Sequence, residues 1–129
     1  MSEVVLDASA LLALLRDEPG AAKVADAIAD ARMSSVNYAE VVSHFIYSGM
    51  PADHIDAMLR PLPMVIVEAD QGLATIAGRL RAVTAEAGLS LGDRFCLALA
   101  RRDGLPALTA DKQWSTVADA ADVTVSVIR

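Results

Sequence analysis

The sequence is poor in cysteine and in aromatic residues. Its 129 residues include one cysteine, and aromatic side chains make up 4% of the chain. Cys96 cannot form an internal disulfide, and its place in the apolar run FCLALA favours a core position over a catalytic thiol. A single cysteine suits a reducing compartment. A chain of this length can bury a core without disulfides or zinc, and it fits one domain that spans residues 1–129.

Long apolar runs and a basic leader are also missing. No segment approaches the ~20 consecutive apolar residues that a membrane-spanning helix requires. The first charged residue is an acid, Glu3, and Asp7 and Arg16 interrupt the first apolar stretch, which is unlike a secretory signal. We therefore expect a soluble, cytoplasmic protein that does not associate with a membrane.

Basic residues are scarce as well. Eleven lysines and arginines face seventeen acids, a formal charge of −6. This balance argues against a simple electrostatic clamp on nucleic acid, because phosphate contacts usually come from a basic surface. It does not exclude a nuclease, since divalent ions can counter a cluster of carboxylates.

What the chain does contain is an alternation of strand and helix patterns. Strands are expected at 4–6 and 64–67, both buried, and at 123–128, 107–109 and 32–34. Helices are expected after Pro19-Gly20, over 36–47, from 52 to before Pro61, over 71–87, and from a Ser90–Asp93 capping box to Gly104. Two apolar helix faces are predicted, namely Ala22, Ala25, Ile28 and Ala29, and Leu73, Ile76, Ala77, Leu80, Val83 and Ala87. This order predicts a three-layer α/β/α domain with a central, mainly parallel sheet of four or five strands.

Two acids directly follow predicted strands. Asp7 comes after Val4–Leu6, and Asp111 comes after the strand at 107–109, where open α/β sheets place their ligand sites. Each could instead cap the helix that follows it. If the two strands are neighbours, the acids approach each other and repel unless a cation bridges them. Trp114, just beyond Asp111, is interpreted as a packing residue.

Two further acids lie in apolar helices. Glu40 is surrounded by apolar residues, and an unpaired buried carboxylate must meet a base, protonate or bind a metal. A surface pair with His44 is the alternative. Asp93 completes the capping box, and the neighbouring Arg94 could pair with another acid or contact phosphate. Together the four acids form the oxygen ligand set that hard divalent cations prefer, which predicts a metal-assisted phosphodiesterase.

Four segments in this order resemble the PIN-domain nucleases, and among them the VapC-type toxins of bacterial toxin–antitoxin pairs. They are Val-Leu-Asp-Ala-Ser-Ala-Leu, Asn-Tyr-Ala-Glu-Val, Leu-Ser-Leu-Gly-Asp-Arg-Phe-Cys-Leu-Ala-Leu-Ala and Leu-Thr-Ala-Asp-Lys-Gln-Trp. The resemblance covers essentially the whole chain and is least specific over 50–85.

The resemblance implies a catalytic and metal-binding quartet with polar residues beside it. The quartet is Asp7, Glu40, Asp93 and Asp111, and the supporting residues are Ser9, Asn37 and Thr109. The implied activity is a magnesium-dependent (or manganese-dependent) endoribonuclease that inhibits translation and growth. The implied partners are RNA, a small cognate antitoxin and a second copy of the chain. The helices over 36–60, with Phe45, Ile46, Tyr47 and Met58, could supply the dimer or antitoxin surface, although most of these residues fit a core.

Other proteins also use an acid at a strand end. Haloacid-dehalogenase phosphatases need a second acid where this chain has Ser9. A phosphoreceiver domain, phosphorylated here on Asp7, needs neighbouring acids and a lysine near its last strand, and neither Lys23 nor Lys112 is well placed. A non-catalytic PIN-fold interaction module would need a broken quartet. The RNA target, the number of metal ions and the path of RNA over an acidic protein stay open.

Overall fold

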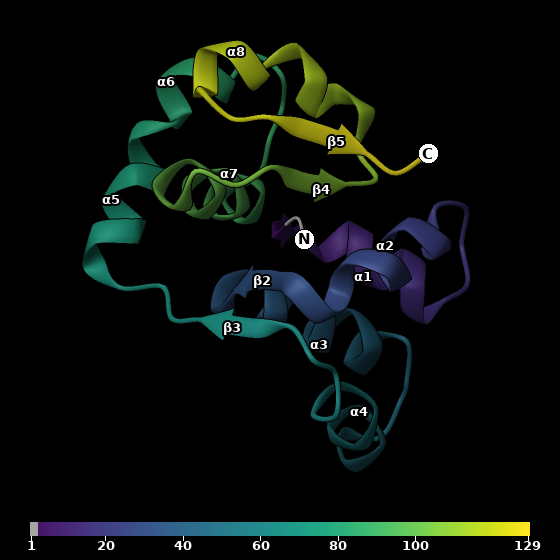
Figure 1. The fold of residues 1–129 in the computed structure, drawn as a ribbon. Coiled ribbons are helices and arrows are strands. Elements are labelled where there is room, and N and C mark those ends of the chain that lie inside the picture. Colours follow the sequence, from purple (N-terminus) through teal and green to yellow (C-terminus); the bar gives the residue numbers. More distant parts are fainter. Residues whose placement is uncertain (1–2) are drawn as a thin grey trace.

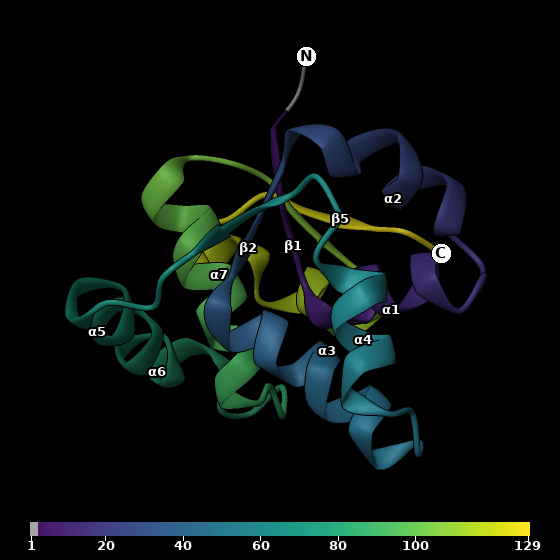
Figure 2. The same cartoon turned by 90° about the horizontal axis from the view of Figure 1, so that it is seen from below.

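A five-stranded parallel sheet lies between two layers of helices in the computed structural model, which describes residues 3–129 (Figures 1 and 2). Residues 1 and 2 of the predicted domain lie outside the described range. The elements are β1 (Val4–Leu6), α1 (Ala8–Leu15), α2 (Ala21–Ala27), η1 (Ile28–Asp30), β2 (Ala31–Ser34), α3 (Ser35–Tyr47), α4 (Ala52–Leu59), β3 (Val65–Val67), α5 (Gln71–Arg79), α6 (Arg81–Thr84), α7 (Leu91–Asp103), β4 (Ala107–Thr109), η2 (Lys112–Thr116), α8 (Ala118–Ala121) and β5 (Val125–Val127), where η marks 3₁₀ helices.

The strand order places the first strand at the centre of the sheet. The order is β3-β2-β1-β4-β5, and all four pairings are parallel. Val5 is in register with Arg32 on one side and with Ala107 on the other. Because parallel strands end at the same edge, residues that follow β1, β2 and β4 are brought together. The predicted α/β/α architecture is confirmed.

The two faces of the sheet bury separate cores. Val4 and Leu6 pack with the layer of α1 to α4, whereas Val5 packs with the layer that contains α5 and α7. Side chains alternate along a strand, so β1 contributes to both cores. Figure 1 shows the layer of α1 to α4 and the layer of α5 to α7 on opposite sides of the strands.

The long helix α7 begins and ends where its sequence signals predicted. The Ser90 side chain accepts a hydrogen bond from the Asp93 backbone, and the Asp93 side chain accepts one from the Ser90 backbone. At the other end Gly104 adopts φ +66°, a left-handed conformation that a side chain would disfavour. The capping box therefore fixes the first turn of α7, and with it Asp93.

The prediction of a buried strand at 64–67 is wrong in one respect. The strand β3 forms, but it is an edge strand with Val65 57% exposed and Ile66 39% exposed. Apolar content alone does not distinguish a central from an edge strand, since the strand order depends on the crossovers.

Two predicted helical faces also need correction. The region 71–87 is not one helix, because α5 ends at Arg79 and α6 covers Arg81–Thr84, and Val83 is 41% exposed. In α2 the buried residue is Val24, while the alanines predicted to face the core are exposed at positions 22, 25 and 29. Alanine is a weak indicator of a buried face because it carries little apolar area. None of the helices in the described part of the chain is long and apolar enough to cross a membrane.

Candidate active site

Asp7 is a buried carboxylate at the centre of the sheet edge. It directly follows β1 and is 4% exposed. Its Oδ2 accepts hydrogen bonds from Ser9 Oγ at 2.6 Å and from Thr109 Oγ1 at 3.0 Å. No ion pair neutralises it among residues 3–129. Asp7 occupies the N-cap position of α1, as the alternative expected, but its side chain makes no cap hydrogen bond.

The environment of Asp7 opposes its ionisation. The pKa of Asp7 is raised from 3.8 to about 6, mainly by burial and to a smaller extent by the charges of Asp93 and Glu40. The hydroxyls of Ser9 and Thr109 lower the pKa in part. A carboxylate that is costly to ionise without a cation is consistent with a site that a cation completes.

The two hydroxyls are held so that they point toward Asp7. Ser9 Oγ accepts the backbone N–H of Ala110 at 3.0 Å, and Thr109 Oγ1 accepts that of Asp111 at 3.1 Å. Each hydroxyl has one proton, which is therefore available to Asp7. The structure thus places Ser9 and Thr109 where they orient this carboxylate across the β1–β4 pairing.

Glu40 is held by an asparagine that bridges two helices. The fully buried Asn37 donates from Nδ2 to Glu40 Oε1 at 2.8 Å and to the carbonyl oxygen of Gly92 at 2.9 Å. Burial raises the pKa of Glu40, the hydrogen bond from Asn37 lowers it, and the charge of Asp93 raises it. The predicted alternative of a Glu40–His44 pair is wrong, because His44 contacts Arg16 instead, at 3.0 Å.

Sequence reasoning missed Gly92. A Cβ built at this position would lie 2.3 Å from Glu40 Oε2 and 2.6 Å from Oε1, so any side chain here would force the Glu40 carboxylate to move. The absence of a side chain lets the Glu40 carboxylate pack against the first turn of α7, beside Asp93. A glycine inside a helix costs about 1 kcal/mol relative to alanine, and that local penalty was the available signal.

Asp93 and Asp111 each cap the start of a helix with one carboxylate oxygen and leave the other oxygen without a hydrogen bond in the described residues. Asp93 Oδ2 accepts the Ser90 N–H at 2.9 Å, and Asp111 Oδ1 accepts the Gln113 N–H at 2.9 Å. Capping by Asp111 and Asp93 is therefore confirmed. Arg94 does not pair with an acid. It is 8% exposed, and its Nη1 donates to the carbonyl oxygen of Leu89 at 2.9 Å. Trp114 is fully buried, as its packing role predicts.

The structure brings three of the four predicted acids into mutual electrostatic range. Asp93 and Glu40 both act on the pKa of Asp7, whereas Asp111 does not contribute to that shift and is exposed. Neighbouring strands β1 and β4 therefore do not by themselves force Asp7 and Asp111 into repulsive contact. Within residues 3–129, no three acid, histidine or cysteine side chains already form a group that could hold an ion.

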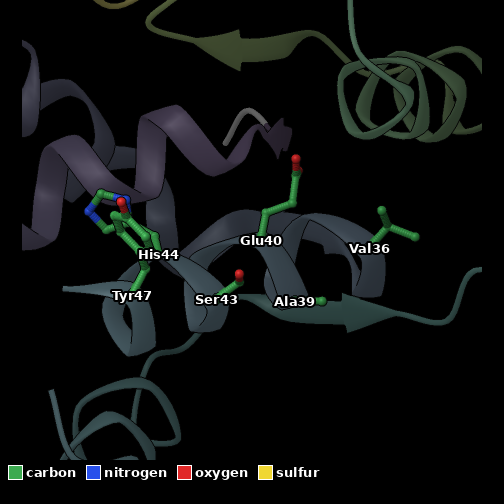
Figure 3. Close-up of a pocket in the computed structure, with 6 residues that line it drawn as sticks. All are labelled: Val36, Ala39, Glu40, Ser43, His44 and Tyr47. Atoms are coloured by element: carbon green, nitrogen blue, oxygen red, sulfur yellow. The ribbon is translucent and has the colours of Figure 1, made fainter. Parts of the chain in front are cut away.

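Each of the four acids nevertheless keeps one oxygen available. Hydrogen bonds hold Oδ2 of Asp7, Oε1 of Glu40, Oδ2 of Asp93 and Oδ1 of Asp111. Within the described residues the second oxygen of each accepts no hydrogen bond. Glu40 also borders an open hollow of about 710 Å³ along α3, and its carboxylate points away from the ribbon of that helix (Figure 3). Hydrogen bonds to one oxygen therefore orient each of the four carboxylates, and the other oxygen of each is left free of protein donors within the described residues.

The raised pKa of Asp7 predicts how stability changes with pH in the metal-free protein. Between pH 3.8 and about 6 the folded state binds more protons than the unfolded state, so the free energy of unfolding falls as pH rises through this window. We expect Asp7 to account for a loss of about 2 kcal/mol between pH 4 and pH 7. Denaturant titrations of the wild type and Asp7→Asn across this range isolate that contribution. A wild-type-minus-variant difference that does not change with pH would contradict it.

A protein-family model and a curated relative both match most of this chain. Residues 4–120 match the PIN domain family. Ribonuclease VapC of Mycolicibacterium smegmatis is 36% identical to this chain, over 81% of this chain and 88% of the relative.

Solved structures share the fold at low sequence identity. A toxin–antitoxin complex from Klebsiella pneumoniae has a TM-score of 0.73 at 19% identity, covering 98% of both chains. DNA-bound VapBC from Salmonella typhimurium has a TM-score of 0.72 at 14% identity, covering 100% of both chains. VapC20 of Mycobacterium tuberculosis, described as a sarcin–ricin loop cleaving toxin, has a TM-score of 0.70 at 19% identity, covering 88% of this chain and 93% of that one.

Proposed function

The chain belongs to the PIN-domain family, and on this premise we propose that it is a metal-dependent endoribonuclease of the VapC type, the toxin of a toxin–antitoxin pair. One observation carries the proposal. Among residues 3–129, Asp7 is buried without a cationic partner beside Glu40 and Asp93, and each of these carboxylates keeps an oxygen that accepts no hydrogen bond.

The residues fit magnesium or manganese. All the donors are carboxylate oxygens, which hard divalent cations prefer over nitrogen or sulfur. Magnesium is usually held by one or two carboxylates and keeps several waters, so a ready-made group of three ligands is not required. Asp7 and Asp93 are the proposed direct ligands, with Asp111 and Glu40 contributing directly or through water. When bound, the ion supplies an activated water and offsets charge on the phosphate.

The chain's own residues would orient the reaction. Ser9 and Thr109 hold Oδ2 of Asp7, so Oδ1 is the oxygen left to bind an ion. Asn37 fixes Oε1 of Glu40, which leaves Oε2 to align a water for attack on the phosphorus. The raised pKa of Glu40 makes it a better proton acceptor at neutral pH than an ordinary glutamate.

Cleavage of RNA with and without metal tests the proposal. We expect the purified protein to cut RNA with magnesium or manganese, to stop when a chelator removes the ion, and to recover when excess ion is restored. The products are resolved on denaturing gels. Cleavage that persists in chelator would contradict the metal dependence, and no cleavage of any RNA with either ion would contradict the nuclease.

The proposed partners follow from the family. The related solved structures include toxin–antitoxin complexes, so we infer a small antitoxin, and we also infer a homodimer. Of the predicted surface residues, Phe45 is buried, whereas Ile46 is 50% exposed and Tyr47 is 93% exposed. These two lie on α3, and Tyr47 borders the hollow that contains Glu40, so a partner seated there would cover Glu40 (Figure 3).

The toxin role is tested in cells. Induced expression is expected to inhibit translation and growth in the cytoplasm, and co-expression of the protein encoded beside it is expected to relieve the inhibition. Phosphorylation of Asp7 has no structural support, since a side chain that is 4% exposed offers little access to a phosphodonor.

A further inference from the structure

The negative charge of the protein is unevenly distributed along the chain. Residues 71–102, which span α5, α6 and nearly all of α7, contain five arginines and two acids, a formal charge of +3. The rest of the chain contains six basic residues and fifteen acids, a formal charge of −9. Although the chain has an overall charge of −6, residues 71–102 therefore form a region with a net positive charge.

Among residues 3–129, four of the five arginines of this region also lack acidic partners. Each of the four arginines outside the segment forms an ion pair with a carboxylate, and so does Arg102, with Asp103. Within residues 3–129 the arginines with no carboxylate inside 4.0 Å all lie in the segment, and they are Arg79, Arg81, Arg94 and Arg101.

Three arginines of the segment line one hollow. Arg79 of α5 and Arg101 and Arg102 of α7 surround a hollow of about 370 Å³, together with Ile76. All three arginines are exposed, and the helices α5 and α7 that carry them pack side by side (Figure 1). We name these three residues and Ile76 the arginine hollow.

The arginine hollow has the chemistry of a phosphate site. Asp103 pairs with Arg102, but Arg79 and Arg101 have no carboxylate within 4.0 Å among residues 3–129. Two uncompensated positive charges that share one hollow repel one another, and an anion between them would relieve that repulsion. Arg79 lies in the last turn of α5, and Arg101 and Arg102 lie in the last turn of α7. The partial negative charge at the C-terminus of each helix offsets part of the positive charge of these arginines. Guanidinium groups match phosphate by donating two parallel hydrogen bonds, which makes a phosphate the preferred anion.

The helix α7 connects the arginine hollow to the acidic site. Asp93 lies in its first turn and Arg101 lies eight residues later, about 12 Å along the helix axis. We propose that the arginine hollow binds the phosphate backbone of the RNA substrate at a point remote from the acids; residues 94–100 of α7 are buried, so the RNA does not contact α7 between the two places. This inference rests on the proposed nuclease function. It assigns RNA rather than an acidic protein because the hollow and the acids share one helix, while the strongly acidic remainder of the chain would repel the backbone elsewhere.

Binding measured at several salt concentrations tests the inference. The probe is a short fluorescein-labelled single-stranded RNA, and the protein carries Asp7→Asn so that the probe stays intact. Adding Arg79→Ala and Arg101→Ala is expected to weaken binding about tenfold or more. The slope of log affinity against log salt is expected to fall by about 0.7 for each RNA phosphate that the variant no longer neutralises. Lysine at both positions keeps the charge and is expected to restore much of the affinity.

A matched control removes two charges elsewhere. Lys23 and Arg60 are exposed and lie outside the segment, so Lys23→Ala with Arg60→Ala changes the net charge equally. We expect this control to keep the RNA affinity of its parent. Equal weakening by both double variants, or unchanged affinity in the arginine double variant, would overturn the inference. Unchanged RNA affinity with abolished binding of a polyglutamate peptide would also overturn it, in favour of an acidic protein partner.

A small substrate separates this inference from the proposed function. Bis(p-nitrophenyl) phosphate is too short to reach from the acids to the arginine hollow. In a chain with Asp7 intact, the arginine double variant is expected to cleave this diester at the wild-type rate while its KM for RNA rises. A wild-type protein that cleaves neither substrate would refute the nuclease, and the anisotropy of the labelled RNA would still decide whether the arginine hollow binds it.

Discussion

Replacing Asp7 with asparagine is expected to slow RNA cleavage by at least about 10³-fold and, at the same time, to stabilise the fold. Asparagine has nearly the same shape, and its carbonyl oxygen can still accept the hydroxyls of Ser9 and Thr109. What disappears is the negative charge that would hold a cation. Because burial raises the pKa of Asp7 to about 6, that charge destabilises the metal-free fold at pH 7. Its removal should raise the free energy of unfolding by about 2 kcal/mol.

The two opposite effects make the result diagnostic. Cleavage rate and urea unfolding are measured on the same preparation at pH 7, without added metal for unfolding. Asp53→Asn is a matched control, since Asp53 is an exposed acid on α4, and it should change neither quantity appreciably. A variant that is inactive because it is unfolded, or one that keeps full activity, would contradict the role assigned to Asp7.

Replacing Gly92 with alanine is expected to reduce cleavage by about 10- to 100-fold without removing any ligand. The new Cβ would lie within 2.6 Å of both Glu40 carboxylate oxygens, so Glu40 must leave its place beside Asp93. The hydrogen bond from Asn37 to Glu40 would break at the same time. Helix propensity favours alanine by about 1 kcal/mol, which offsets part of the steric cost to stability. Activity should therefore fall far more than the free energy of unfolding, as parallel kinetics and denaturation would show.

A double variant and a control at another glycine test whether Gly92 acts through Glu40. In Gly92→Ala with Glu40→Asp, the shorter side chain withdraws the carboxylate from the new methyl group, so part of the activity should return. Such recovery measures the coupling between the two positions. Gly78→Ala is the matched control, because a Cβ at Gly78, in α5, meets no atom within 4 Å and activity should be unchanged. No recovery in the double variant would mean that Gly92 acts other than through Glu40.

Much of the fold was predictable because its signals are local. Strand and helix patterns depend on residues that are neighbours along the chain, and the Ser90–Asp93 box and Gly104 marked the ends of α7 correctly. The residue types around Asp7 and Glu40 were equally informative, since a carboxylate amid apolar residues needs a partner wherever the chain places it. Errors arose where the pattern was equivocal, at the exposed strand β3 and at the break between α5 and α6.

The sequence by itself determined most of the helices and strands, the acids at their ends and the family that the chain resembles. The tertiary structure alone decided how these acids are used. It placed Glu40 against Gly92 and gathered arginines from α5 and α7 around one hollow. The physical reason is that desolvation, close contact and charge repulsion act between atoms that are near in space. Residues 37 and 92, or 79 and 101, become neighbours only when the sheet has ordered its crossovers.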